Sequence, residues 1–449
     1  MLRFSSYIES NRYHRGVGRL SFMRTMAALV AAHLFLSTVG IGQIQSPRTV
    51  GDHVGSAAGS DHVGGGALPA DIMKLRREGH EALYNLDNAT AVEKFEEIRR
   101  RAPHHPAGDL YLATAIWLKH LSKTRRLQTG LYSSGSSFYS GASASKEEAE
   151  GDAVDMDVDR AFRERMAQAK TKALALVAKY KNDADALYFL GSYYGLMAGY
   201  EASTARKFLS AMRNGSRCVD AHEKVLKLKP DYYDAYLSIG VYDYIVGNLP
   251  FSYKFLATMA GVRGNKKRGI TRLQTIIEKN AATADDARVL LVAIFRNEKR
   301  YEDALSLLEQ LSSKYPSGYL LKLEKASTLV TLNRANDAYA VFESLLKDPS
   351  AASALDLINY QYAEALARNK EYKRAAAAFI ATNQIQGADA NLATISRLRA
   401  AQMYDLAGER KEAISNYNAV LARPNVYDTK QQAEKGLNKP FIVKEKKGD

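Results

Sequence analysis

The chain has 449 residues, of which 46% are hydrophobic and 25% are charged, and its formal net charge is +14. Such proportions are typical of a folded soluble protein. The single cysteine, Cys218, excludes an intramolecular disulfide and a zinc site built from cysteine ligands. Because the basic residues are interspersed with acidic ones, the positive charge indicates a solvated surface, and we expect no nucleic-acid partner.

An apolar segment, residues 26–44, follows a basic N-terminal stretch. A basic region, an apolar core and small residues before a cleavage site are typical of a secretory signal. Gly40 and Gly42 have the spacing of such small residues, which predicts cleavage near Gln43. An uncleaved membrane anchor is the alternative, because about 18 apolar residues can just span a bilayer. We therefore predict that residues 1–42 are a signal peptide or a membrane anchor.

Residues 43–70 are rich in glycine and serine and show no apolar period, which predicts a disordered linker. The related sequences GDHVG and SDHVG within it contain His53 and His62. Two isolated histidines are more typical of a spacer than of a metal site, and we expect no metal here.

From residue 71 to residue 424, a pattern of small and bulky residues recurs with a period of about 34 residues. Ala91, Phe95 and Ile98 are spaced so that they form one stripe on a helix, and Gly79 is a small residue inside the preceding helix. The stripe returns further along the chain at Ala304 with Leu308, Ala338 with Phe342, Ala375 with Phe379, and Ala413 with Tyr417.

The middle of the chain fits the same pattern once insertions are allowed. Gly191 and Gly240 take the small position of a first helix, and Cys218 takes the position where alanine normally opens the stripe of a second helix. The pattern predicts about eight helix pairs. Since each pair buries its apolar face only against its neighbours, we expect an all-α, right-handed solenoid.

This pattern resembles the tetratricopeptide repeat (TPR), whose unit is a pair of antiparallel helices. Residues from about 105 to 350 also resemble a subgroup with widened repeats, the inclusion-body clearance proteins. That likeness lies in DALYFLGSYYGL and in PDYYDAYLSIGVYDYIVGNLP, followed by a glycine-containing basic turn. The first resemblance implies a protein-binding scaffold, and the second implies lipid-body or membrane-linked scaffolding rather than catalysis.

Three insertions separate the first helix of a pair from the second, near residues 121–158, 198–206 and 247–265. They are expected on one edge of a solenoid, where insertions often mark the binding face. The first is polar, and its acidic run from Asp155 has the spacing of a calcium loop without the glycine and the glutamate that such a loop needs. We expect these acids to stabilise the start of the next helix.

The third insertion combines an apolar stripe with a basic turn. Packing within the fold is the favoured interpretation, and contact with an anionic membrane surface or with a partner helix is the alternative. A nucleotide site is disfavoured, because the turn lacks the full phosphate-loop pattern. The stripe consists of Phe251, Phe255, Leu256 and Met259, and the basic residues are Arg263, Lys266, Lys267 and Arg268.

The TPR resemblance implies that first helices line a concave partner groove. In pairs two to four this lining is apolar and aromatic, which favours a hydrophobic segment or an acyl chain, since aromatic anchors tend to carry binding energy. Filling of the groove by the protein's own inserted helix is the alternative. The candidate groove residues are Leu110, Trp117, Leu118, Tyr188, Leu196, Leu237, Val241, Tyr244 and Ile245.

No metalloprotease, serine-hydrolase or phosphate-loop motif occurs, so we expect no catalytic residue, cofactor or metal. We predict an exported TPR scaffold that binds a protein or peptide partner at the bacterial cell envelope, in the periplasm or anchored by the N-terminal segment. The alternative is a carrier of a lipid or another hydrophobic ligand in the groove. Residues 425–449 are predicted to form a basic C-terminal tail.

Overall fold

The structure is a computed structural model that describes residues 65–123, 155–205, 207–249, 263–426 and 428–443. These residues form 17 α-helices and two short 3₁₀ helices, and they contain no strand. The predicted all-α fold of repeated helix pairs is confirmed. The chain divides into a first unit, which ends at Arg300, and a second unit, which begins at Tyr301.

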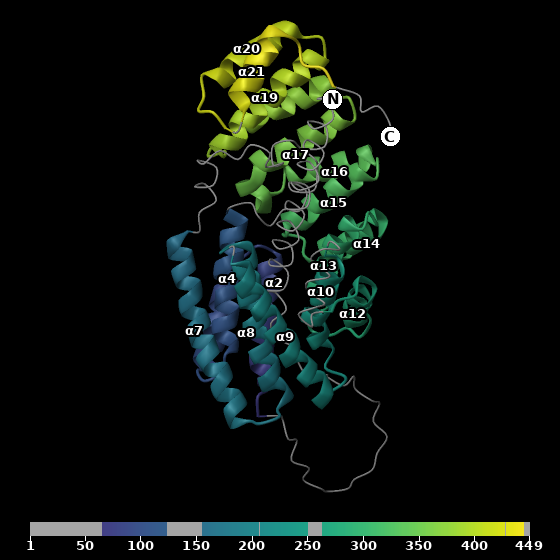
Figure 1. Ribbon diagram of the computed structural model, residues 1–449. Coiled ribbons are helices and arrows are strands. Elements are labelled where there is room, and N and C mark those ends of the chain that lie inside the picture. The colour runs from purple at the N-terminus through teal and green to yellow at the C-terminus, as the bar shows by residue number, and fades with distance from the viewer. Residues whose placement is uncertain (1–64, 124–154, 206, 250–262, 427, 444–449) are drawn as a thin grey trace, which may run out of the picture. The chain divides into compact units, whose positions relative to one another are not determined.

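In the first unit each helix packs against the next one along the chain (Figure 1). The helices form the first four predicted pairs, α2–α3, α4–α7, α8–α9 and α10–α12, and α13 follows them. Their bounds are α2 (Ala70–Tyr84), α3 (Asn88–Arg101), α4 (Ala107–Lys123), α7 (Met156–Lys179), α8 (Ala184–Ser203), α9 (Phe208–Leu228), η1 (Tyr233–Ala235), α10 (Tyr236–Gly247), α12 (Lys266–Glu278) and α13 (Ala284–Asn297).

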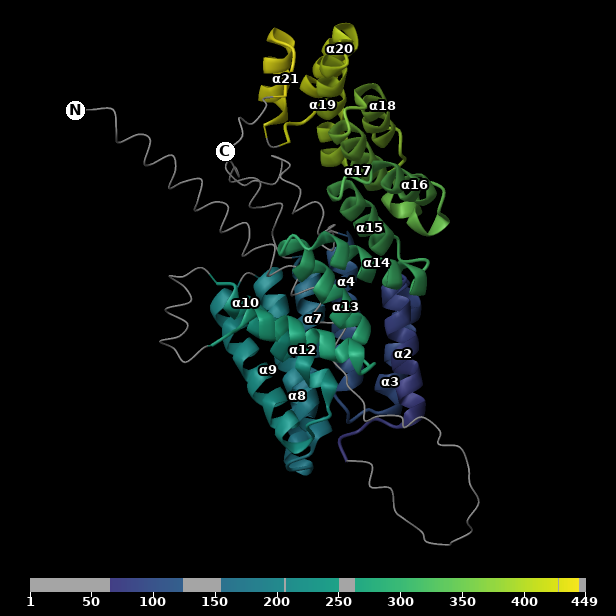
Figure 2. The ribbon, with the colours of Figure 1, turned by 90° about the vertical axis from the view of Figure 1, so that its right-hand side faces the viewer.

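The second unit continues the same arrangement, with each helix packed on its successor (Figure 2). It begins with α14, and the pairs α15–α16, α17–α18 and α19–α20 follow. The bounds are α14 (Tyr301–Lys314), α15 (Tyr319–Thr331), α16 (Ala335–Leu345), η2 (Pro349–Ala354), α17 (Leu355–Arg368), α18 (Tyr372–Thr382), α19 (Ala390–Leu406), α20 (Arg410–Leu421) and α21 (Thr429–Asn438).

The turn between the two helices of a pair is closed in the same way at five places in the described chain. One residue takes a positive φ, and the N–H of the next residue donates to the carbonyl oxygen five positions earlier, as Asp87 does to Ala82 over 2.8 Å. Such a helix end satisfies carbonyl groups that would otherwise lack a partner. The residues with positive φ are Leu86, Lys299, Asn333, Lys370 and Gly408, so the interval from Lys299 to Asn333 equals the expected period.

Small residues allow the close helix contacts that the repeat pattern predicts. A Cβ atom at Gly79 would lie 2.3 Å from the ring of Phe95, and one at Gly191 would lie 2.3 Å from the ring of His222. At Gly240 the nearest atom is a backbone carbonyl oxygen of α12, at 3.0 Å. Because helix interfaces are packed as densely as crystals, a larger side chain at these positions must displace its neighbour.

The described parts of the first two insertions extend helices. The second insertion lengthens α8, which continues to Ser203, and only a short turn precedes α9 at Phe208. The acidic run of the first insertion caps α7, because the Asp155 carboxylate accepts hydrogen bonds from the N–H groups of Asp157 and Val158 at 3.0 and 3.2 Å. This agrees with the predicted stabilisation of a helix start.

The packed array extends beyond residue 424, where the sequence predicted a basic tail. Helix α21 covers the last pair, with Ala433 fully buried against Tyr417 and Val420. Its Gly436 lies so close to Tyr417 that a Cβ atom would meet the ring at 2.3 Å. A terminal repeat otherwise exposes its apolar face, so a capping helix is expected, and small residues on a basic helix make it possible.

The predicted signal or anchor, residues 1–42, and the predicted linker up to residue 64 lie outside the described residues, as do residues 124–154 and 250–262 of the insertions. Among the described residues, no helix combines the length and the apolar character that a membrane crossing requires.

Candidate functional site

All nine candidate groove residues lie on first helices of their pairs, as the helical period predicts. Three lie on α4, two on α8 and four on α10. Eight of them are at most 8% exposed, and only Ile245 is half-buried. These side chains therefore belong to the interior of the first unit in this structure, and their contact with a partner stays a prediction.

Trp117 shows how this interior is built. Its indole Nε1–H donates to the hydroxyl of Thr204 over 2.7 Å, and its ring packs edge-to-face on Phe162 and Tyr200 at 6.1 and 5.5 Å. The rings of Phe162 and Tyr200 are themselves stacked at 3.8 Å. The side chains of α4, α7 and α8 thus form one aromatic core, which joins pair two to pair three.

The basic turn after the third insertion is tied to the first unit by ion pairs. Lys266 lies 2.6 Å from Glu298, which also accepts a hydrogen bond of 2.7 Å from Tyr244. Arg268 pairs with the buried carboxylate of Asp243. These contacts support packing within the fold as the role of Lys266 and Arg268.

The remaining residues of the predicted membrane or partner helix divide into two groups. Arg263 and Lys267 are exposed and described. The apolar stripe of Phe251, Phe255, Leu256 and Met259 lies outside the described residues, so the structure does not test whether it contacts a membrane.

The fold brings Cys218 and His222 together on α9, a pair that the motif search does not single out. His222 Nε2–H donates to the carbonyl oxygen of Tyr188 at 3.1 Å, so its Nδ1 accepts the hydroxyl of Ser238 at 2.5 Å and lies 3.9 Å from the thiol. Burial raises the pKa of Cys218 to about 12 and lowers the pKa of His222 to about 4. Both groups are therefore neutral at pH 7, and the pair serves packing rather than nucleophilic chemistry.

His105 also has a structural role. It is hydrogen-bonded through Nε2 to the carbonyl oxygen of Gly66 at 3.1 Å, and its ring packs edge-on against Phe189. Burial lowers its pKa to about 4. No cluster of metal-ligating side chains is found in the part of the chain that the structure describes.

A set of buried polar side chains inside the first unit is also not apparent from the sequence. Arg76 on α2, Tyr111 on α4 and Asp286 on α13 are each at most 4% exposed. Asp286 accepts a hydrogen bond of 2.5 Å from Tyr84, which stands 202 positions earlier in the chain. The first helix of pair one therefore meets the helix that follows pair four, and polar side chains from distant repeats converge.

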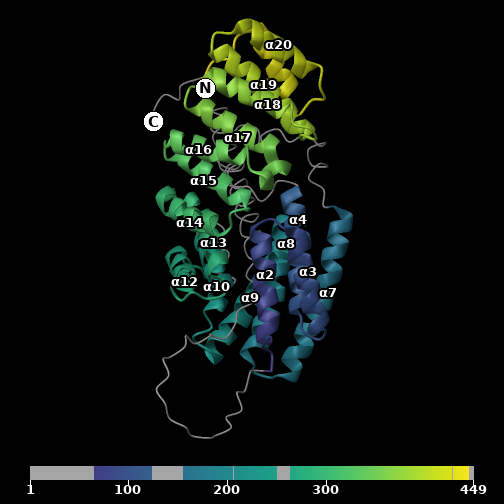
Figure 3. The ribbon, with the colours of Figure 1, turned by 180° about the vertical axis from the view of Figure 1, so that it is seen from behind.

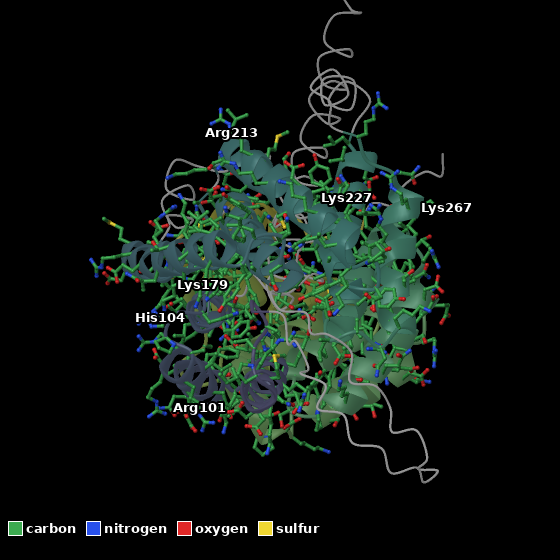
Figure 4. The ribbon with its side chains drawn as sticks, turned by 90° about the horizontal axis from the view of Figure 1, so that it is seen from below. Arg101, His104, Lys179, Arg213, Lys227 and Lys267 are labelled. Carbon is green, nitrogen blue, oxygen red and sulfur yellow. The ribbon has the colours of Figure 1, made fainter. Side chains whose placement is uncertain are left out.

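Exposed basic side chains are spread over the first unit rather than gathered on one helix. Figure 4 shows the basic side chains of Arg101 on α3, His104 in the turn before α4, and others on later helices, all of which are exposed. The remaining labelled residues are Lys179, Arg213, Lys227 and Lys267. This distribution agrees with the solvated surface expected from the charge pattern.

The family model described as Iml2/Tetratricopeptide repeat protein 39 matches residues 236–387, which include helices α10 to α18. The predicted resemblance is confirmed. The matched region overlaps the later part of the segment in which the sequence resembles the inclusion-body clearance proteins. No curated protein matches the chain.

Solved TPR structures are similar to much of the chain at low identity. A tetratricopeptide repeat protein from Parabacteroides merdae is 11% identical with a TM-score of 0.29, and the match covers 77% of this chain and 100% of that one. Yeast Tom70 is 13% identical with a TM-score of 0.31, covering 81% and 88%. The TPR domain of P58(IPK) is 15% identical with a TM-score of 0.22, covering 82% and 97%. At these values no function is transferred from them.

Proposed function

We propose that this protein is an exported scaffold that gathers protein partners at the bacterial cell envelope. The family match over α10 to α18, together with the stacked helix pairs of both units, carries the scaffold part of the proposal. Stacked repeats suit this role because they present extended surfaces to other proteins. The apolar segment at residues 26–44, which follows a basic stretch, supports export.

The start of α9 is the place where we expect a partner to bind. Leu209 and Met212 are large apolar side chains that are 73% and 56% exposed, and neighbouring exposed apolar side chains mark interaction sites more often than isolated ones do. They are three positions apart and therefore lie on one face of the helix. Exposed Lys207 and Arg213 flank them in the sequence. An apolar spot beside positive charge suits a protein that offers an apolar anchor within acidic surroundings.

Photo-crosslinking in intact cells tests the partner. A photoreactive amino acid at position 209 or 212 should give a discrete product that contains a second protein, and mass spectrometry should identify that protein as an envelope component. The same substitution at Leu174 of α7, which is 44% exposed, is the matched control and should not give this product. Identical products at 174 and 209, or none at either, would contradict binding at this surface.

Export is tested by fractionating cells that express the protein with a C-terminal tag and by sequencing its N-terminus. A start near Gln43 in the periplasmic fraction supports a cleaved signal, whereas an intact N-terminus in the membrane fraction supports an anchor. An intact chain in the soluble cytoplasmic fraction would refute export, while the scaffold part of the proposal would stand.

The hydrophobic-ligand carrier requires an open apolar groove. The candidate lining residues are instead buried within the first unit, apart from the half-buried Ile245. No feature of the described residues favours this alternative, and the discovery of a stoichiometric lipid in the purified protein by mass spectrometry would reinstate it.

A further inference from the structure

The turns that follow the second helices of the first unit lie along one edge of the array. The ring of His105, in the turn after α3, packs on the first turns of α8. Tyr232, in the turn after α9, donates a hydrogen bond of 2.8 Å to Asp185 at the start of α8. Thr283, before α13, donates two hydrogen bonds to Asp234 in the turn after α9. Consecutive pairs therefore present their turns at a common edge, where the end of α3 lies beside the starts of α2 and α4 (Figure 3).

Lysines gather at this edge. Five of them stand within two residues of the end of a second helix, and none forms an ion pair with a described residue. By contrast, the three arginines at the end of α3 all pair with acids. Four of the five lysines are exposed, and one is half-buried. We call this set the lysine edge, and it consists of Lys179, Lys181, Lys227, Lys229 and Lys279.

Apolar and aromatic side chains accompany these lysines. The partial negative charge of a helix C-terminus favours a nearby cation, which accounts for basic residues at the helix ends but not for their neighbours. Leu228 is 46% exposed at the end of α9. The ammonium groups of Lys179 and Lys279 lie over the rings of Tyr180 and Tyr233, 5.0 and 5.7 Å from the ring centroids. Lysine, tyrosine and an exposed leucine together are typical of a surface that meets the interface of a bilayer.

The N-terminal part of the chain joins the fold at the same edge. Gly65 packs on the ring of Tyr180, and the carbonyl oxygen of Gly66 is hydrogen-bonded to His105 at 3.1 Å. The apolar segment at residues 26–44 ends 20 residues before Gly65, and a chain of that length spans at most about 70 Å. A bilayer that holds this apolar segment is therefore tethered to the lysine edge.

We propose that the lysine edge rests on the surface of an anionic phospholipid bilayer, with its ammonium groups on lipid phosphates and Leu228 among the headgroups. Such binding needs several cations on one surface rather than a shaped pocket, and each lysine near an anionic surface strengthens it about fivefold. The contact is separate from the proposed partner site, because Leu209 lies at the other end of α9, about 28 Å from Leu228. A scaffold held in this way keeps the start of α9 available to a protein.

An environment-sensitive fluorophore tests the contact in the full chain. The label is attached to Leu228→Cys, while the native Cys218, which is 2% exposed, stays unlabelled. Vesicles of equimolar phosphatidylglycerol and phosphatidylcholine should increase the emission of the label and shift it to the blue, and phosphatidylcholine alone should not. The label is read instead of total binding, because the apolar segment at residues 26–44 can attach the chain to either vesicle. The matched control is Leu209→Cys, which should not respond.

Two charge variants of the labelled Leu228→Cys protein locate the attraction. The edge variant should need about 100-fold more anionic lipid for the same response, because three contributions of about fivefold multiply. Its substitutions are Lys181→Gln, Lys229→Gln and Lys279→Gln. The control variant loses the same charge from exposed lysines near the opposite ends of α4, α9 and α12, and its response should stay unchanged. Its substitutions are Lys119→Gln, Lys207→Gln and Lys267→Gln.

Three results would overturn the proposal. The label at position 228 stays silent on anionic vesicles, it responds no more than the label at position 209, or the response is lost in the control variant and kept in the edge variant. The last result would assign the membrane contact to the basic turn that contains Lys267. None of these results depends on export or on a protein at the start of α9, so the proposed function is tested separately.

Discussion

Replacing Gly191 with alanine should destabilise the first unit, whereas the same change at Gly215 should stabilise it. The two glycines lie inside neighbouring helices, α8 and α9. A Cβ atom at Gly191 would lie 2.3 Å from the buried ring of His222, but one at Gly215 would meet only Tyr242, at 4.0 Å. The comparison therefore isolates the close helix contact from the general effect of removing a glycine.

The expected magnitudes follow from these contacts. Overpacking of a helix interface costs about 1–3 kcal/mol. Displacing His222 also strains its bonds to Ser238 and to the Tyr188 carbonyl oxygen, and leaving a buried polar group unpaired costs about 1–3 kcal/mol. Alanine recovers about 1 kcal/mol of helix propensity. We expect Gly191→Ala to lower the free energy of unfolding by about 2–4 kcal/mol and Gly215→Ala to raise it by about 0.5–1 kcal/mol.

Urea unfolding followed by tryptophan fluorescence measures both changes. Trp117 is the single tryptophan of the chain and is fully buried in the first unit, so its emission reports this unit alone. Equal gains in stability for the two variants would refute the close contact between α8 and α9. A loss at both positions would show instead that backbone flexibility, rather than packing, determines the response.

Three further predictions concern a hydrogen bond, a turn and a buried acid. Thr204→Val removes the acceptor of the Trp117 N–H bond and should lower the urea midpoint of the first unit by the equivalent of about 1–3 kcal/mol. Thr204→Ser keeps a hydroxyl acceptor and should leave the midpoint unchanged. An unchanged midpoint in the valine variant would contradict a stabilising role of this hydrogen bond. Lys370 has a φ of +63°, so Lys370→Gly should stabilise the second unit by about 1 kcal/mol in thermal unfolding, whereas glycine at an exposed lysine inside α18 should destabilise it. Burial raises the pKa of Asp286 from 3.8 to about 8. Between these values the folded state holds a proton that the unfolded state has released, so the stability of the first unit should fall as the pH rises from about 4 to about 8. Asp286→Asn keeps an acceptor for Tyr84 and should make the stability of the first unit, measured by urea titration, nearly independent of pH across that range. If the stability of the variant falls as steeply as that of the wild type, the pH dependence belongs to another group.

Local spacing was sufficient to predict the helix pairs and much of their packing. Gly79 and the stripe of Ala91, Phe95 and Ile98 occupy the contact faces that the helical period assigns to them, and the stripe is fully buried. Such a pattern is readable because the side-chain direction on a helix depends only on position along the chain. The same logic placed Cys218 in the core, where it is 2% exposed.

The exposure of the candidate groove could not be predicted in this way. The period correctly placed Tyr188, Leu237 and Tyr244 on first helices, yet all three are buried. Helical periodicity shows which side chains share a face, but it does not show whether that face remains open when several pairs stack. For a related reason the sequence did not predict that the packed array continues past residue 424. Helix α21 packs there because the end of the pair α19–α20 would otherwise expose apolar side chains.

The sequence by itself determined the repeating helices, their caps and the positions of the small residues, because these depend on neighbours within one or two turns or one repeat. Only the tertiary structure decided which polar groups meet in the interior. Arg76 and Tyr111 come from different pairs, and Tyr84 reaches Asp286 across 202 positions. The burial of these side chains and the pKa of Asp286 depend on how the helix pairs of the first unit stack on one another, and no local pattern in the sequence records that stacking.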